Sequence, residues 1–182
     1  MDIELVMRAQ RGDRAAFGLL ATEIATRFLA VSRRILRDID LAEDATQQAL
    51  VAIWRDLPQL RDPARFDAWS YRLLVRACYA EGRRSRAWSP NLRILEADEP
   101  AASNGYETVV QRDQLETAIR RLSVDHRTAL VLHHYADIPV ERVAQILGVP
   151  VGTVLSRLHY AMRAMRAALD ADDRPAAAEA IR

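Results

Sequence analysis

The segment GVPVGTVLSRLHYAMRA, residues 148–164, combines a helix boundary with side chains that can contact DNA. Gly148 can end one helix and Pro150 can begin the next. On the second helix, small hydroxyl groups suit a close approach to bases or phosphates, and arginines suit guanine edges or phosphates. The polar face carries Thr153, Ser156, Arg157, His159, Tyr160 and Arg163. The pattern predicts a helix that contacts DNA.

A helix is also predicted before this segment, over PVERVAQIL, so that helix, turn and longer helix follow one another. This is helix-turn-helix architecture, in which the first helix braces the second in the major groove. An ordinary surface helix in a bundle shows a similar turn, and that alternative stays open. Spacings of three, four and seven residues predict a buried stripe on the second helix: Val151, Val154, Leu158, Met162, Met165 and Leu169.

A second candidate surface lies on the helix predicted from about Arg65 to Arg86. Its spacing places five arginines and a tyrosine on one face, namely Arg65, Arg72, Arg76, Tyr79, Arg83 and Arg86. A basic stripe that contains an aromatic residue favours nucleic acid over a membrane surface or a plain solvated face. Phe66 and Trp69 are expected to belong to the core rather than to form stacking platforms.

The charges are segregated along the 182-residue chain, although its net charge is only +1. Residues 57–93 hold eight arginines and three acids, residues 94–141 four arginines and nine acids, and residues 142–169 four arginines and no acid. Two basic blocks therefore flank an acidic one. All 26 basic residues are arginine, which favours forked contacts to phosphate and guanine, although a GC-rich genome would produce the same bias.

The composition excludes several kinds of site. The single cysteine, Cys78, rules out an internal disulfide framework and a Cys/His zinc cluster. The histidines at 126, 133, 134 and 159 lack an acid at ligand spacing, and the neighbours 133 and 134 point about 100° apart on a helix. No Walker loop, nucleophile elbow or paired carboxylates occur in the sequence. We therefore predict no metal, no cofactor and no enzymatic activity.

Apolar residues recur at helical spacing almost throughout, which predicts an all-α protein. We expect two small helical domains joined by a flexible linker, the C-terminal one a helix-turn-helix. Helices are expected over about 14–35, after an N-cap at Asp13, and over 41–56, 65–86, 109–122, 125–136, 139–147 and 150–169. The predicted domains are 1–86 and 109–169, with a linker at 87–108 and a disordered tail at 170–182.

The N-terminal residues MDIELVMRAQRGD carry neither a basic segment nor an apolar core of the kind found in signal peptides. By inspection, no apolar run approaches the roughly 18 residues of a membrane-spanning helix. We therefore expect a cytoplasmic protein without membrane insertion.

Three motifs together carry a family resemblance: DATQQALVAIWRDL, FDAWSYRLLVRACYAEGRRSR, and the ending that contains GVPVGTVLSRLH. From about Leu5 to Leu169 the chain resembles a bacterial RNA polymerase sigma factor of the extracytoplasmic-function group, within the sigma-70 family. The resemblance implies a factor that binds core RNA polymerase, at the beta-prime clamp and the beta flap, and gives it promoter specificity. Its N-terminal domain would recognise and melt the minus-10 element, and its C-terminal domain would bind the minus-35 element.

The resemblance also implies roles for individual residues. The polymerase-binding helix would use Asp44, Gln47, Gln48, Val51, Trp54 and Arg55. The loop 57–65 would capture a flipped base, and the minus-10 set is Arg61, Arg65, Phe66, Trp69, Tyr71, Arg72, Arg76, Tyr79 and Arg83. The minus-35 set is Thr153, Leu155, Ser156, Arg157, His159, Tyr160 and Arg163.

The sequence departs from the family pattern at a few of these positions. The family often has Asn, Asp and Leu where this chain has Arg76, Ala80 and Gly82, and usually a lysine or arginine where it has Leu155. Two interpretations of Leu155 compete. The favoured one places it at the edge of the buried stripe, and the other lets it contact a thymine methyl group. Both predict weak reading of guanine at the facing base.

Two alternative functions stay open. A stand-alone regulator of the LuxR type has a similar ending but no use for the helix at 41–56 or the basic stripe. A degenerate sigma paralogue would bind polymerase or another partner without opening promoters. Because the sequence contains no Cys/His sensor cluster, control is expected from outside the chain, for example by an anti-sigma factor.

Overall fold

The computed structural model describes residues 2–88 and 117–172, and within these ranges the chain forms helices and short turns only. An N-terminal unit contains α1 (Ile3–Gln10), α2 (Arg14–Leu36), α3 (Ile39–Asp56), the 3-10 turns η1 (Leu57–Gln59) and η2 (Pro63–Arg65), and α4 (Phe66–Trp88). A C-terminal unit contains a helical turn at 117–121, α6 (Val124–Leu130), the π-helical turn η3 (Val131–Tyr135), α7 (Val140–Leu147) and α8 (Val151–Asp172). The all-α prediction with two helical domains is confirmed.

Side-chain caps explain where the long N-terminal helices begin. The Asp13 carboxylate accepts a hydrogen bond from the Ala16 amide at 3.0 Å, which starts α2 as predicted. Asp38 caps α3 in the same way through the Leu41 amide at 2.9 Å, so α3 begins two residues earlier than expected. Asp2 caps α1, a helix that the sequence pattern did not predict.

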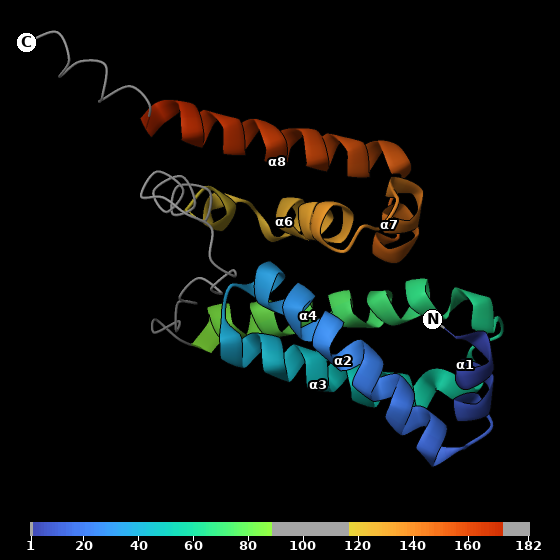
Figure 1. Ribbon diagram of the computed structural model, residues 1–182. Coiled ribbons are helices and arrows are strands. Elements are labelled where there is room, and N and C mark those ends of the chain that lie inside the picture. Colours follow the sequence, from blue (N-terminus) through green and yellow to red (C-terminus); the bar gives the residue numbers. More distant parts are fainter. Residues whose placement is uncertain (1, 89–116, 173–182) are drawn as a thin grey trace, which may run out of the picture.

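Helix α2 is the central helix of the N-terminal unit, lying against α1, α3 and α4 (Figure 1). It is long and apolar enough to cross a membrane by length and composition alone, so the expectation that no run comes near that length was wrong. Its apolar side chains instead form the protein core, with Leu20, Ile24, Phe28 and Ile35 all fully buried. A core helix of a water-soluble bundle passes the same length and composition test.

The helix-turn-helix forms as the glycine and proline predict. Gly148 ends α7 in the left-handed region at φ 68°. The amides of Gly148 and Val149 both donate to the Ala144 carbonyl, at 2.9 and 3.1 Å. The Pro150 carbonyl then accepts from the amides at the start of α8. The turn thereby fixes the direction of α8 relative to α7.

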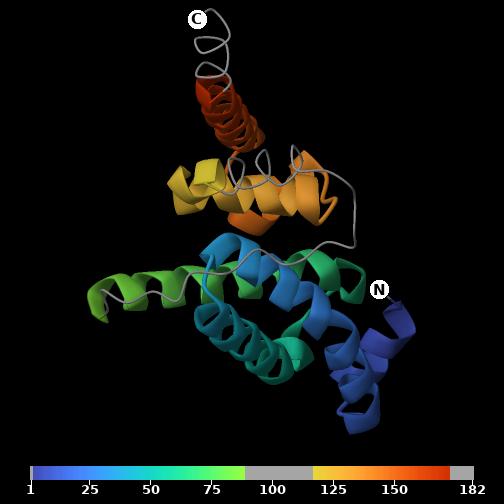
Figure 2. The same ribbon diagram turned by 60° about the vertical axis from the view of Figure 1, so that its left-hand side comes forward.

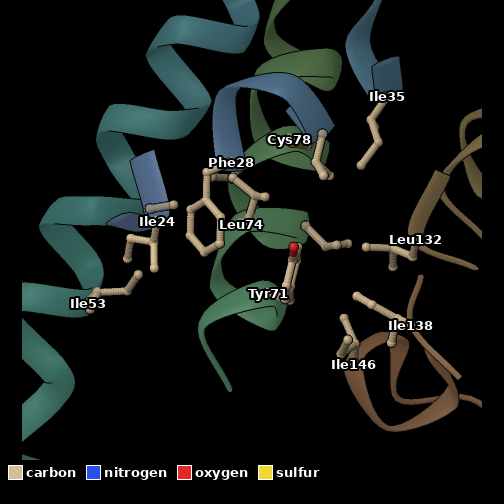
Figure 3. Packing of buried hydrophobic residues seen from close by; sticks show 14 of the residues in the cluster. Ile24, Phe28, Ile35, Ile53, Tyr71, Leu74, Cys78, Leu132, Ile138 and Ile146 are labelled. Carbon is tan, nitrogen blue, oxygen red and sulfur yellow. The ribbon is translucent and has the colours of Figure 1, made fainter. Parts of the chain in front are cut away.

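The two units lie one on the other, with α6 and α7 facing α2 and α4 in both views (Figures 1 and 2). One continuous cluster of buried apolar residues runs through both units. Tyr71 of α4 lies beside Leu132, Ile138 and Ile146 of the C-terminal unit (Figure 3). The units therefore share a hydrophobic interface.

Some predicted boundaries need correction, and others fall outside the described residues. Helix α4 extends to Trp88, past the expected start of the linker at 87, and α8 extends to Asp172, into the expected tail. The rest of the linker, the helix start at 109–116 and residues 173–182 lie outside the described residues. On α8, Val154, Leu158 and Ala161 are buried, whereas Val151 is exposed, so its placement in the buried stripe was wrong.

Candidate nucleic-acid interface

The exposed side of α8 begins with an apolar pair. Val151 and Leu155 are 40% and 53% exposed, one helical turn apart. The favoured interpretation of Leu155 as an edge-of-core residue is therefore wrong. The reason is that the face of α8 packed against the core contains Val154 and Leu158. Val151 and Leu155 lie beside that face and are left uncovered. The exposed pair is free to contact an apolar group on DNA.

The remaining predicted minus-35 residues fall on the same side of α8. Ser156, His159, Tyr160 and Arg163 are exposed, and Thr153 is half-buried. The Tyr160 ring stacks on His126 of α6, with ring centroids 4.9 Å apart and an interplanar angle of 15°. This stacking holds the tyrosine in one orientation above the helix surface.

Arg157 differs from its neighbours because it already has a protein partner. Its Nη2 donates to Oδ2 of Asp125 at 2.8 Å, and its side chain is only 19% exposed. The other carboxylate oxygen of Asp125 accepts a hydrogen bond from the Tyr79 hydroxyl at 2.9 Å. Arg157, predicted for the minus-35 element, and Tyr79, predicted for the minus-10 element, thus share the carboxylate of Asp125. The sequence had not pointed to Asp125.

The predicted minus-10 residues separate into exposed and covered groups. The exposed group is Arg61, Arg65, Arg72, Arg76 and Arg83. Arg65 lies on η2 rather than on α4 and forms an ion pair with Asp62 at 3.2 Å. Arg72, Arg76 and Arg83 lie exposed on α4 as the predicted stripe requires, whereas its first arginine belongs to the preceding turn and the side chain of Arg86 lies outside the described ones.

Three of the predicted minus-10 residues on α4 contact the C-terminal unit. Arg72 donates from its guanidinium to the Gln145 carbonyl of α7, and the Tyr79 hydroxyl contacts α6 as described above. Tyr71 is 8% exposed within the interface. Burial raises the pKa of both phenols, that of Tyr79 to about 12. Both tyrosines therefore stay neutral at physiological pH.

The two aromatic residues at the start of α4 lie where the sequence predicted. Phe66 is 1% exposed and Trp69 is half-buried against the same core, with ring centroids 5.9 Å apart. The assignment of Phe66 to direct minus-10 contact is wrong for this reason, since a buried ring cannot stack on a base. Its packing instead fixes the position of η2 and of the loop before it.

The predicted polymerase-binding residues of α3 form one surface. Asp44, Gln47, Gln48, Val51 and Arg55 line an open groove of about 400 Å³ together with Ala52. Trp54 is 44% exposed beside Phe17 of α2, with ring centroids 4.6 Å apart. Exposed apolar side chains beside polar ones are typical of a protein interface.

Buried polar residues that the sequence did not reveal support these surfaces. Glu81, 3% exposed, accepts a hydrogen bond from Gln48 and forms an ion pair with Arg84, so it ties the groove of α3 to α4. Arg127, 8% exposed, donates to the Ile35 carbonyl across the two units. A charged residue within an apolar helical run, as in VDHRTALVL, was the signal available in the sequence.

No cluster of metal-ligating side chains occurs within residues 2–88 and 117–172. The rings of His133 and His134 meet edge to face at 4.6 Å instead of pointing apart, and Nδ1 of His133 contacts the Ile138 carbonyl at 2.9 Å. His133 and His134 therefore serve packing and hydrogen bonding, whereas His159 is exposed on α8.

Comparison with protein families matches residues 20–88 to Sigma-70 region 2 and residues 112–165 to Sigma-70, region 4. Curated relatives include the RNA polymerase sigma-H factor of Pseudomonas aeruginosa, 32% identical over 180 residues, covering 92% of this chain and 93% of the relative. The ECF RNA polymerase sigma-E factor of Haemophilus influenzae is 30% identical over 176 residues, covering 88% and 90%.

Two solved structures share the fold. CnrH in complex with the cytosolic domain of CnrY superposes with a TM-score of 0.71 at 24% identity, covering 94% of this chain and 98% of that one. The sigma factor RpoE of Bartonella quintana in complex with the anti-sigma factor NepR gives a TM-score of 0.66 at 22% identity, covering 86% and 98%.

Proposed function

The chain belongs to the extracytoplasmic-function group of the sigma-70 family, and we propose how its residues divide the work of promoter-specific initiation. It is an alternative sigma factor that binds core RNA polymerase and directs transcription from particular promoters. A stand-alone regulator of the LuxR type is not favoured, because residues 20–88 match Sigma-70 region 2. A degenerate, non-initiating paralogue is not favoured either, since both sigma regions are present in order.

The groove on α3 is the proposed contact for the beta-prime clamp of polymerase. The observation that carries this proposal is that five of the six predicted residues line one groove, with Trp54 exposed nearby. A groove with a central aliphatic side chain and a flanking tryptophan suits an inserted partner helix. The C-terminal unit is the proposed contact for the beta flap.

Promoter DNA is proposed to contact two further surfaces. The minus-10 element would meet the η1–η2 loop and the exposed arginines of α4, where Arg61, Arg65, Arg76 and Arg83 are available for phosphates. The minus-35 element would meet the exposed side of α8, with Leu155, Ser156 and Tyr160 nearest the base edges. The proposed domains are 1–86 and 109–169 with a linker at 87–108, and the family matches at 20–88 and 112–165 support this division.

The protein is proposed to work in the cytoplasm, without a metal, a cofactor or catalytic activity of its own, because its partner polymerase supplies the chemistry. An anti-sigma factor is a proposed partner. One structural neighbour is a complex of a sigma factor with the anti-sigma factor NepR. Another is a complex of CnrH with the cytosolic domain of CnrY.

The polymerase assignment can be tested with two matched substitutions. Val51→Arg places a long cation in the α3 groove, and we expect it to weaken binding to sigma-free core polymerase by about tenfold or more, since a buried unpaired charge opposes docking. Leu19→Arg introduces the same group at an exposed apolar position of α2 outside the groove, and its affinity should stay near wild type. Equal binding by both variants, measured by fluorescence anisotropy, would reject the groove.

A further inference from the structure

We propose that Asp125 is an internal competitor of promoter DNA, which holds one residue of each promoter-binding surface while the two units are docked. The inference rests on the proposed function, because it takes Tyr79 as a minus-10 residue and Arg157 as a minus-35 residue. Its partner surface belongs to the same chain: the side of α4 that faces α6 and α7 (Figure 2).

The carboxylate of Asp125 engages both groups in good geometry. Oδ1 accepts from the Tyr79 hydroxyl at 2.9 Å, and Oδ2 accepts from Arg157 at 2.8 Å. A carboxylate and a DNA phosphate offer the same ligand to a guanidinium, namely paired anionic oxygens. While Arg157 stays on Asp125, its Nη2 group is not available to a phosphate or a guanine edge, and the paired carboxylate offsets its positive charge.

Two neighbouring residues of α4 also contact the C-terminal unit. Arg72 is held by the Gln145 carbonyl, and Tyr71 is buried beside Leu132 and Ile146 (Figure 3). A DNA strand that lies along this side of α4 would occupy the place of α6 and α7. The docked arrangement is thus incompatible with full use of the minus-10 surface.

The polymerase groove stays open in the same arrangement. Helix α3 lies on the side of the N-terminal unit away from α6, α7 and α8 in both views (Figures 1 and 2), and Val51 is 60% exposed. The docked chain can therefore meet polymerase while its promoter-binding residues are held.

The role of Asp125 can be tested by removing its charge. Asp125→Asn keeps the shape of the side chain but weakens the contact with Arg157. Glu141→Gln is the matched control, because Glu141 is also an exposed acid in the first turn of a helix in the C-terminal unit. Spin labels at Leu19→Cys on α2 and Arg166→Cys on α8, in a Cys78→Ala background of the full chain, report the distance between the units.

We expect Asp125→Asn to raise the ratio of undocked to docked chains by about three- to tenfold, the effect of one ion pair and one hydrogen bond at a partly exposed site. Glu141→Gln should match wild type. The double variant Asp125→Arg with Arg157→Asp restores the ion pair in reverse and should return the distance distribution to the docked form. An unchanged distribution in Asp125→Asn, with far-ultraviolet circular dichroism showing a folded chain, would overturn the proposal.

Competition with DNA is measured on the same variants with a 40-base-pair duplex of random sequence as the probe. Asp125→Asn should bind it several-fold more tightly than Glu141→Gln, although both lose one negative charge. If Asp125→Asn undocks the two units but does not bind the duplex more tightly, the proposal that Asp125 competes with DNA is overturned. A separate experiment tests whether Arg157 binds the promoter at all. If polymerase that carries Arg157→Ala binds the promoter as wild type does, the assignment of Arg157 fails, whatever the Asp125 variants show.

Discussion

The Nε atom of Arg127 donates a hydrogen bond to the main-chain carbonyl of Ile35 at 2.6 Å, across the two helical units and 92 residues apart in sequence. The same guanidinium lies 3.4 Å from the carbonyls of Ile119 and Leu122. Arg127 therefore satisfies the last carbonyls of a helix in each unit at once. It is the buried polar centre of the interface.

Replacing Arg127 with alanine should destabilise the protein by about 2 to 4 kcal/mol, because buried carbonyls would lose their donors. Arg127→Lys should lie between alanine and wild type, since one ammonium group cannot span the same carbonyls. Urea unfolding monitored by circular dichroism measures both effects. Arg166→Ala, at an exposed site of α8, is the control, and an equal small loss in both alanine variants would contradict the structural role of Arg127.

Leu155 should read a thymine methyl group in the minus-35 element. Replacing the facing thymine by uracil removes one methyl group, and we expect a loss of about 0.8 kcal/mol, or roughly fourfold in affinity. In Leu155→Ala the uracil and thymine duplexes should bind equally. Binding of polymerase holoenzyme to a promoter scanned with single uracil substitutions tests this. Persistent discrimination in Leu155→Ala would assign the methyl contact to another residue.

Gly82→Ala should stabilise the N-terminal unit by about 0.5 to 1 kcal/mol, the usual difference in helix propensity. The position allows it, because an added Cβ would meet only Leu36 Cδ2 at 3.5 Å, an ordinary contact distance. Thermal unfolding measures the gain. A loss of stability would mean that α4 needs the glycine for its conformation or for closer packing than this distance implies.

Cys78 should make stability fall at alkaline pH. Burial raises the pKa of its thiol from an ordinary value of 9.0 to about 11, so between these pH values the folded state keeps its proton while the unfolded chain loses one. The contribution is complete below about pH 9 and is lost as pH rises toward 11, with a slope of up to about 1.4 kcal/mol per pH unit. Urea unfolding at pH 7 and pH 10 measures the difference.

Cys78→Ala is the control for this pH dependence, because it removes the thiol and leaves the other titrating groups in place. The variant should lose less stability between pH 7 and pH 10 than wild type does. A native chain should also resist thiol reagents at pH 8, since the side chain is fully buried. Rapid native-state labelling, or identical pH profiles, would contradict this account of Cys78.

Much of the fold was predictable because local signals and periodicity agreed. Asp13 starts α2, Gly148 ends α7, and Pro150 precedes α8, as the sequence predicted. Each is set by residues within one turn of the boundary. Helix α1 was missed, since its eight residues give too short a periodic pattern to distinguish from a turn.

The candidate surfaces were predictable to the level of the helix face, but not to the level of contacts. Periodicity grouped Leu155 with the core of α8, whereas its exposure depends on where the covering helices stop. The partners of Tyr79 and Arg72 come from the other unit, many residues away in sequence. Such pairs are set by docking, for which a single sequence carries no local signal.

We expect this chain, together with core polymerase, to open promoters that share a two-part sequence. The most direct measurement is permanganate footprinting of upstream regions of the host genome, with purified full-length protein and sigma-free core polymerase. We expect reactive thymines at a common minus-10 element, located downstream of a common minus-35 element, and much weaker reactivity when Val51→Arg replaces the wild-type chain at a limiting concentration. Stable polymerase binding without any reactive thymine would contradict it.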